Sequence, residues 1–239
     1  MADQLTLGFL GGTGPQGRGL GLRFAVAGHE VLIGSRNAQR AESVVTEMLA
    51  GRDLPIHGLA NADAAAAADV VFLIFPFEGQ AEVLPDLAGP IGDKVVVDVI
   101  NPLAWDERGA FPIPIPEGSA AQQAQALLPR ARVTAAFHHA PLRLLADLDR
   151  ACETDALVVG DDPGAREVVI GLADEIPGCR GIDAGPLRLA GQLEGLTAVI
   201  VGVNRRYKIH AGIRITRLSE ERRLQAMSRG AGGERGPGS

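Results

Sequence analysis

The sequence feature that most constrains the fold is a glycine-rich turn near the N-terminus. An apolar run at residues 5–10 stops at this turn, which has the spacing G-x-G-x-x-G, and a helical pattern over residues 18–27 follows. Gly28 is placed to end that helix. A strand, such a turn and a helix in this order are typical of the first unit of a dinucleotide-binding sheet. The turn consists of Gly12, Thr13, Gly14, Pro15, Gln16 and Gly17.

Each glycine of the spacing has a separate task. Gly12 allows the tight turn, Gly14 lets the backbone approach a pyrophosphate, and Gly17 allows the helix to pack closely on the strand. The free N–H groups at the start of the helix favour a phosphate group. A glycine turn without a ligand is the alternative, since a chain with 31 glycines contains such spacings by chance. We predict a nucleotide site at the turn.

The choice of nucleotide is predicted from the end of the second strand, expected at residues 30–33. An NAD site places a carboxylate there, to bind the ribose 2′-hydroxyl. This chain has Gly34, Ser35 and Arg36, with Arg40 one helical turn further on. A hydroxyl and two guanidinium groups suit a 2′-phosphate. The sequence therefore favours NADP, with a merely solvated helix face as the alternative role of the two arginines.

The rest of the chain alternates between strand and helix patterns. Two continuous apolar runs, at residues 70–75 and 94–100, suit strands that are buried on both faces of a parallel sheet. Further strands are expected at residues 56–59, 132–137 and 156–159, and helices at 37–49, 62–68, 120–128 and 163–176. This alternation predicts an α/β fold, a Rossmann-type doubly wound parallel sheet.

The C-terminal part predicts a smaller unit. FPIPIPEG at residues 111–118 should be an extended loop over the sheet. Residues 181–186 are expected to form a turn, and residues 187–207 a long apolar helix. We predict an NADP-binding Rossmann domain at residues 1–185 and a small C-terminal helical domain at 186–218. Residues 219–239 lose apolar periodicity and gain glycine, which indicates a disordered tail.

Composition excludes several classes of protein. Apolar residues make up 46% of the chain, but no apolar run reaches the roughly 18 residues of a membrane span. The N-terminus lacks the pattern of a secretory signal, so we expect a cytoplasmic protein. A net charge of −6 disfavours binding to nucleic acid or a membrane surface. Cys152 and Cys179 have no metal-ligand spacing, and neither a metal site nor a disulfide is expected.

Short segments along most of the chain resemble one family. They are G-G-T-G at 11–14, G-S-R at 34–36, G-D-D at 160–162, D-A-G-P-L at 183–187, N-R-R-Y-K at 204–208 and H-A-G-I-R at 210–214. Over residues 5–218 the chain resembles the NADPH-dependent coenzyme F420 reductases, also called F420H2:NADP oxidoreductases. The resemblance implies a homodimer that exchanges hydride reversibly between NADP and the 5-deazaflavin F420, which is a substrate.

The resemblance also implies site residues. The family's NADP contacts would fall on Thr13 to Gln16, Ser35, Arg36, Arg40, Phe75, Pro76 and Gly79, and also on Asn101, Leu142 and Ala211. His138 matches a histidine beside the deazaflavin, whereas His139 departs from the small polar residue of the family's pattern. His138 is expected to hydrogen-bond the deazaflavin or to manage the proton at its N1, with a purely structural role as the alternative.

Direct hydride transfer between two stacked rings asks the protein for proximity and orientation. The sequence shows no Ser-His-Asp, Cys-His or paired-carboxylate signature, which fits this chemistry. One alternative is an NADP-dependent imine or ketone reductase related to pyrroline-5-carboxylate reductase, although few residues remain after Pro163 for the larger helical domain of such enzymes. A non-catalytic NADP-binding protein is the other. Binding of a deazaflavin would distinguish an F420 reductase from both of these alternatives.

Overall fold

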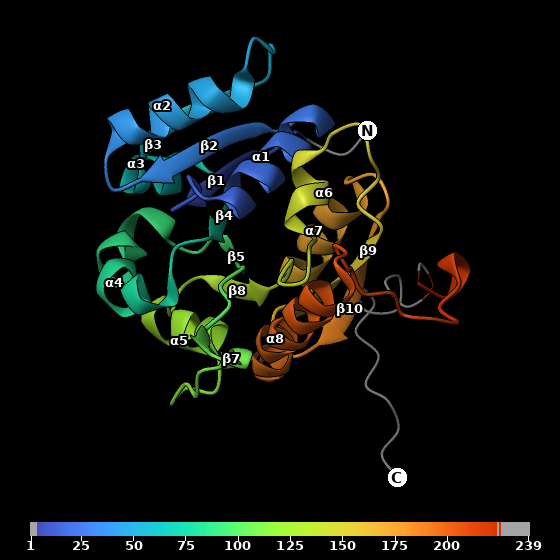
Figure 1. Ribbon diagram of the computed structural model, residues 1–239. Coiled ribbons are helices and arrows are strands. Elements are labelled where there is room, and N and C mark those ends of the chain that lie inside the picture. The colour runs from blue at the N-terminus through green and yellow to red at the C-terminus, as the bar shows by residue number, and fades with distance from the viewer. Residues whose placement is uncertain (1–3, 224, 226–239) are drawn as a thin grey trace.

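The computed structural model describes residues 4–223 and 225 of the chain. Its centre is an eight-stranded sheet in the order β10-β9-β8-β5-β4-β1-β2-β3 (Figure 1). The strands of this sheet are β1 Thr6–Leu10, β2 Glu30–Ser35, β3 Ile56–Ala60, β4 Val70–Leu73, β5 Val95–Asp98, β8 Arg132–Ala135, β9 Thr154–Gly160 and β10 Cys179–Gly185. The α-helices are α1 Pro15–Ala27, α2 Ala38–Leu49, α3 Asn61–Ala67, α4 Gln80–Ile91, α5 Ala120–Leu127, α6 Leu142–Ala146, α7 Pro163–Asp174 and α8 Ala190–Tyr207.

The sheet is parallel from β3 to β8, as predicted, and mixed beyond it. Strand β9 pairs with β8 in the antiparallel direction, and β10 pairs with β9 in the parallel direction. The parallel part has the order 3-2-1-4-5 followed by β8, which is the strand order of a doubly wound nucleotide-binding sheet. The α/β fold with a Rossmann-type sheet is thereby confirmed, with a reversed pair of strands at one edge.

Two apolar cores cover the two faces of the sheet. Successive side chains of a strand point to opposite faces, so Phe9 belongs to one core and Leu10 to the other. Helices α1, α2, α6 and α7 pack in the core of Phe9, where the ring of Phe9 stacks on Phe72 with centroids 4.6 Å apart. Helices α3, α4 and α5 pack on the opposite face. Because the strands from β3 to β8 run parallel, the loops that follow them all lie at the carboxyl ends of these strands.

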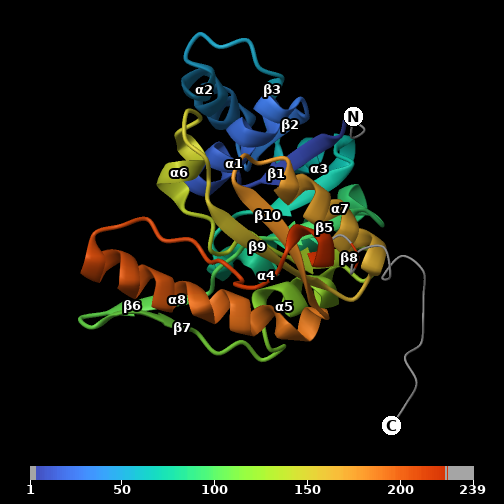
Figure 2. The same cartoon turned by 90° about the vertical axis from the view of Figure 1, so that its right-hand side faces the viewer.

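The long helix α8 leaves the sheet and lies along a hairpin. Figure 2 shows α8 beside strands β6 Leu103–Asp106 and β7 Gly109–Pro112, which pair with each other only. A 3-10 turn at Leu187–Leu189 precedes α8, and its Leu187 is buried against the sheet. Leu193, in the first turns of α8, is buried there as well. Further along, Val199 is 58% exposed. The apolar helix predicted at 187–207 is therefore present, but its first turns belong to the core of the sheet.

Two predicted loops are wrong in part. Residues 181–186 were expected to turn, yet they continue β10 as far as Gly185. Gly181 is there for packing: a Cβ at this position would lie 2.6 Å from the Ile170 carbonyl oxygen of α7. In the proline-rich segment, Phe111 and Pro112 form the end of β7, where a hairpin edge tolerates proline. Residues 113–118 form neither helix nor strand.

The predicted disorder after Leu218 is wrong for residues 219–223. Residues 220–223 are helical, and Arg223 is buried. Its Nη1 donates to the Asp174 carboxylate at 2.7 Å and to the Gly181 carbonyl oxygen at 2.9 Å. Partners this distant in the sequence leave no local pattern. Residues 226–239 of the predicted tail lie outside the described residues. None of the described helices has the length and apolar character needed to cross a bilayer.

Candidate active site

A first pocket lies over the loops that follow β1, β2 and β4. Its volume is about 450 Å³. Most of its lining was predicted from the sequence: Thr13, Ser35, Arg36, Arg40, Phe75, Pro76 and Gly79, to which the structure adds Gly11, Asn37, Asn61 and Val83. The carboxyl ends of parallel strands on either side of β1 are where open α/β sheets bind ligands.

The glycine turn shapes one end of this pocket. The Gly12 N–H donates to the carbonyl oxygens of Phe9 at 3.0 Å and of Gly34 at 3.1 Å. A Cβ on Gly17 would lie 2.4 Å from the Gly12 carbonyl oxygen, so α1 can approach β1 only with glycine there. At Gly14 a Cβ would meet nothing within 4 Å. The turn therefore leaves open space at Gly14, beside the free N–H groups at the start of α1.

Two arginines, Arg36 and Arg40, lie at the other end of the first pocket. Asn37 caps α2 by accepting a hydrogen bond from the Arg40 backbone N–H at 3.1 Å, and the Asn37 N–H donates to the Ser35 hydroxyl at 3.3 Å. These bonds fix the short segment that carries Arg36. Within residues 4–223, neither Arg36 nor Arg40 forms an ion pair, although both line the pocket. Their guanidinium groups are therefore available to an anionic ligand.

Asn61 is a pocket residue that the sequence analysis missed. Its Oδ1 accepts a hydrogen bond from the Gly11 N–H at 3.1 Å, and the residue is buried. It holds the glycine turn from α3, far along the chain. An asparagine at a helix start is common enough that the sequence contains no signal for this contact.

A second pocket, of about 330 Å³, is formed by the segments after β5 and β8 and by α8. It brings together the predicted residues Gln16, Asn101, His138, Leu142 and Ala211. The structure adds His139, Ala140, Pro141, Arg143, Thr197, Ile200, Val201, Asn204 and His210. The predicted residues Gly12, Gly14, Pro15 and Gly17 stay in the turn and line neither pocket.

Gln16 lines the second pocket, and Thr13 of the same turn lines the first. Gln16 belongs to the glycine turn and to the first turn of α1, and it donates from Nε2 to the Phe137 carbonyl oxygen at 3.1 Å. Phe137 has a φ of 62°, a left-handed conformation that is rare outside glycine. That conformation turns the chain sharply after β8, directly before His138. The bend and the Gln16 contact thus place the second pocket against the end of the glycine turn.

Hydrogen bonds join the walls of the second pocket. The Thr197 hydroxyl of α8 donates to Asn101 Oδ1 at 2.8 Å, and the Ala211 N–H donates to Asn204 Oδ1 at 2.7 Å. His139 Nε2 lies 2.7 Å from the Leu193 carbonyl oxygen. His139, which departs from the family pattern, therefore ties the segment after β8 to α8.

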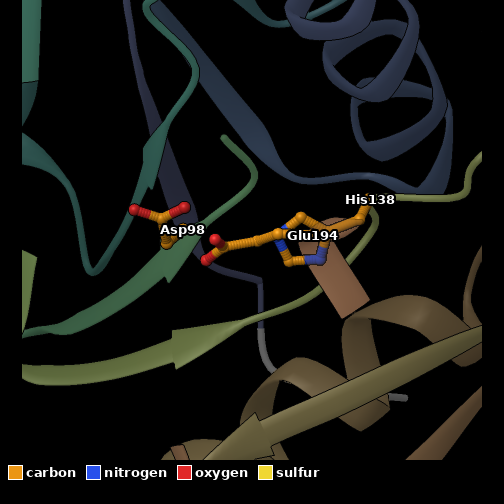
Figure 3. Close-up of side chains that lie close together, drawn as sticks. All are labelled: Asp98, His138 and Glu194. Atoms are coloured by element: carbon orange, nitrogen blue, oxygen red, sulfur yellow. The ribbon is translucent and has the colours of Figure 1, made fainter. Parts of the chain in front are cut away.

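Behind this pocket three titratable side chains meet (Figure 3). Asp98 ends β5, His138 follows β8, and Glu194 lies in the first turns of α8. One ligand-type atom from each lies within 4.8 Å of the others, and all three residues are buried. The sequence analysis found no paired carboxylates, because Asp98 and Glu194 are far apart in the chain. We refer to Asp98, His138 and Glu194 as the buried triad.

Burial sets the charge of the triad. Desolvation lowers the pKa of His138 to about 3, helped by the neighbouring His139, so its imidazole is neutral. Desolvation raises the pKa of Glu194 to about 7, against the opposing effect of the Ala120 and Ala121 N–H groups that donate to its carboxylate. Desolvation, and then the nearby Glu194, raise the pKa of Asp98 well above its usual range.

Comparisons with known proteins agree on one family. A family model described as "NADP oxidoreductase coenzyme F420-dependent" matches residues 6–102. The F420-dependent NADP reductase of Methanothermobacter thermautotrophicus is 40% identical over 225 residues, which cover 91% of this chain and 97% of that protein. Among solved structures, an Arthrobacter sp. FB24 protein assigned as an F420-dependent NADP reductase aligns with a TM-score of 0.77 and 26% identity, over 89% of this chain and 100% of that one.

The alternative reductase class shares the fold alone. A pyrroline-5-carboxylate reductase of Coxiella burnetii aligns with a TM-score of 0.57 at 11% identity, over 96% of this chain and 77% of that one. The identity and the nearly complete coverage of the methanogen enzyme decide between the two classes. The chain therefore belongs to the F420-dependent NADP reductases.

Proposed function

We propose that the protein catalyses reversible hydride transfer between NADP(H) and coenzyme F420. The observation that carries this proposal is the placement of the glycine turn between the two pockets, since Thr13 lines the first pocket and Gln16 lines the second. With both cofactors bound, hydride passes directly between nicotinamide C4 and deazaflavin C5. The protein then contributes the relative placement of the two rings.

The first pocket is the proposed NADP site. The open space at Gly14 suits the pyrophosphate, which the N-terminus of α1 would bind. Ser35, Arg36 and Arg40 would hold the 2′-phosphate, since both guanidinium groups line the pocket without a carboxylate partner among residues 4–223. Phe75, Pro76 and Gly79 would contact the nucleotide from the loop after β4. The nicotinamide end would extend past Gln16 toward Asn101, Leu142 and Ala211.

The second pocket is the proposed deazaflavin site. Its walls combine apolar side chains, such as Leu142 and Ile200, with the polar groups of Asn101 and Thr197, which suits a flat heteroaromatic ring. His138 lines this pocket and is neutral. Because both of its ring nitrogens are buried, its ring would have to turn toward the pocket to exchange a hydrogen bond with a ring nitrogen or carbonyl of the deazaflavin. We assign it as the proposed catalytic residue.

The test is a spectrophotometric assay of NADPH oxidation with oxidised F420 as acceptor. We expect NADPH to be consumed and F420 absorbance to fall in equal amounts, with NADH at least tenfold less effective because it lacks the 2′-phosphate. The comparison acceptors are free flavin and a cyclic imine. Oxidation of NADPH by the imine but not by F420 would contradict the proposal and favour the imine reductase class.

We further propose a cytoplasmic homodimer in which residues 186–218 form the small second domain, after a Rossmann domain at residues 1–185. The exposed apolar side chains Val199, Tyr207, Ile209, Trp105 and Phe111 lie on α8, the segment that follows it and hairpin β6–β7, and such surfaces commonly mark association sites. Cys152 and Cys179 are both free thiols, which fits a reducing compartment.

Substitution of an exposed valine tests the dimer. Val199→Glu should give a monomer by light scattering with unchanged circular dichroism. Val26→Glu on α1 is the matched control, because Val26 is 56% exposed and lies on the opposite face of the sheet from α8. A parent protein that is already monomeric and fully active would refute the assembly.

A further inference from the structure

The buried triad has more polar groups than its surroundings satisfy. Within the described residues, both ring nitrogens of His138 and Oδ2 of Asp98 are buried without a hydrogen-bond partner. The other Asp98 oxygen accepts from the Ile100 N–H at 2.9 Å. Buried polar atoms are almost always paired in proteins, so unpaired ones at a single point indicate a function.

Two carboxylates in this position cannot both be charged. Asp98 is fully buried, and Glu194 is 2% exposed. Within residues 4–223, no lysine or arginine forms an ion pair with either of them. The charge of Glu194 is supported by the two N–H groups at the start of α5, whereas Asp98 accepts one N–H only. Like charges this close in a dry site force one carboxyl group to keep its proton. The proton therefore resides mainly on Asp98.

The other groups around the triad do not change which carboxyl group holds the proton. His139 is the other titratable group against His138, and desolvation lowers its pKa, so it is neutral as well. The start of α5 presents N–H groups, and the segment after β5 presents the Ile100 N–H. One nitrogen of His138 lies within 4.8 Å of both carboxylates, while the residue also lines the second pocket. His138 therefore stands between the carboxyl pair and the proposed deazaflavin site.

We propose that Asp98 and Glu194 form a buried proton store that serves the second pocket through His138. The inference rests on the proposed function. Reduction of F420 by NADPH adds a hydride at C5 and a proton at N1, with NADP⁺ as the other product, so each turnover consumes one proton. In this direction His138 donates its N–H proton toward the pocket and accepts the carboxyl proton at its other nitrogen. The pair is then reloaded from solvent, and the reverse reaction runs these transfers backwards.

The store can be detected without any cofactor. Infrared spectra of the free protein at pH 6 should contain a carboxylic-acid carbonyl band that shifts in D₂O and loses intensity in Asp98→Asn, where only the Glu194 carboxyl still contributes to it. Since the Glu194 carboxyl has a pKa of about 7, further loss of protonated carboxyl is expected as the pH rises through that value. Thr134→Val is the control, because Thr134 is equally buried on the neighbouring strand β8 but lies outside the triad.

Kinetics test the connection to the reaction. Asp98→Asn keeps the acceptor for the Ile100 N–H but holds no exchangeable acid proton. It should lower kcat for F420 reduction on the order of 100-fold and leave the KM for F420 and the Kd for NADPH within about twofold. The decline of kcat above about pH 7 should remain, because it comes from the Glu194 carboxyl. Asp98→Glu should restore part of the rate. Thr134→Val should keep the parental rate and pH profile.

Several results would overturn the store. One is a parent protein without the infrared band at pH 6. Another is an Asp98→Asn variant with the parental rate. A third is a stoichiometric divalent metal ion in the parent that is lost in Asp98→Asn, which would make the triad a cation site. If the band is present but the parent does not reduce F420, the carboxyl pair stands and the proposed function fails. Glu194→Gln serves as the second variant, with circular dichroism to follow its capping of α5.

Discussion

The two pockets of this protein are built in different ways. The first takes most of its lining from short segments directly after β1, β2 and β4, in which neighbouring residues act together. The second draws on segments after β5 and β8, on α8 and on the chain beyond it. A pocket made of local motifs can be recognised from the spacing of residues in one sequence, whereas the members of the second pocket, apart from Gln16 of the glycine turn, were predicted only through the family resemblance. The comparison also predicts that substitutions in each pocket have separable effects.

The largest effect is expected at the glycine turn. Gly14→Val should weaken NADPH binding about 100-fold or more, because the side chain fills the space for the pyrophosphate and its hydrogen bonds to the α1 N–H groups are lost. The melting temperature should stay near that of the parent, since a Cβ at Gly14 meets no atom within 4 Å. Titration calorimetry and thermal denaturation measure both quantities.

Gly17→Ala provides the contrast within the same turn. Its Cβ would lie 2.4 Å from the Gly12 carbonyl oxygen, so the expected loss is in stability, about 1–3 kcal/mol. A Gly14→Val protein that still binds NADPH at nearly parental affinity would mean that the turn is structural only.

The next effect concerns the 2′-phosphate. Arg36→Ala should weaken NADPH binding roughly tenfold to 100-fold through the loss of charge-assisted hydrogen bonds worth about 1.5–3 kcal/mol, and leave NADH binding unchanged. Isothermal titration with both nucleotides measures this. Arg52→Ala is the control, because Arg52 is an exposed arginine that lines neither pocket. Equal losses for both nucleotides would refute the assignment of Arg36.

Substitution of Asn61 tests whether the glycine turn depends on its hydrogen bond to α3. Asn61→Ala leaves the Gly11 N–H without its acceptor, so we expect a loss of about 1–3 kcal/mol in stability. NADPH affinity should drop several-fold as the turn loses its support. Asp63→Ala, at an exposed position of the same helix, should change neither quantity. If Asn61→Ala leaves both unchanged, the turn is held by its own sequence alone.

The smallest effect is expected in the second pocket. Thr197→Val keeps the shape of the side chain but removes the hydrogen bond to Asn101, which is worth about 1 kcal/mol. We expect the KM for F420 to rise about fivefold while the Kd for NADPH is unchanged. Steady-state kinetics with each substrate varied in turn measure the split. A change in NADPH affinity alone would contradict the separation of the two pockets.

Much of the fold could be predicted because its signals are local. The alternation of apolar runs and helical patterns predicted the strands around β1 and the helix at residues 37–49, which the structure confirms as α2, with Ala41, Val44, Val45 and Met48 buried. Gly28 ends α1 in a left-handed conformation, as its position indicated. The failures occur where glycine and arginine act through distant partners. Gly181 marks close packing of β10 on α7, and Arg223 is ordered by Asp174 and Gly181.

The sequence by itself determined the Rossmann-type sheet, the glycine turn and the group of Ser35, Arg36 and Arg40, because neighbouring residues of one loop share one pocket wherever the sheet places it. Only the tertiary structure decided that Asp98, His138 and Glu194 meet in a buried triad. No spacing along the chain encodes that contact, since it depends on β5, β8 and α8 packing on one another. Burial then decides their charge: desolvation raises the pKa values of both carboxyl groups and keeps the imidazole neutral, which composition cannot reveal.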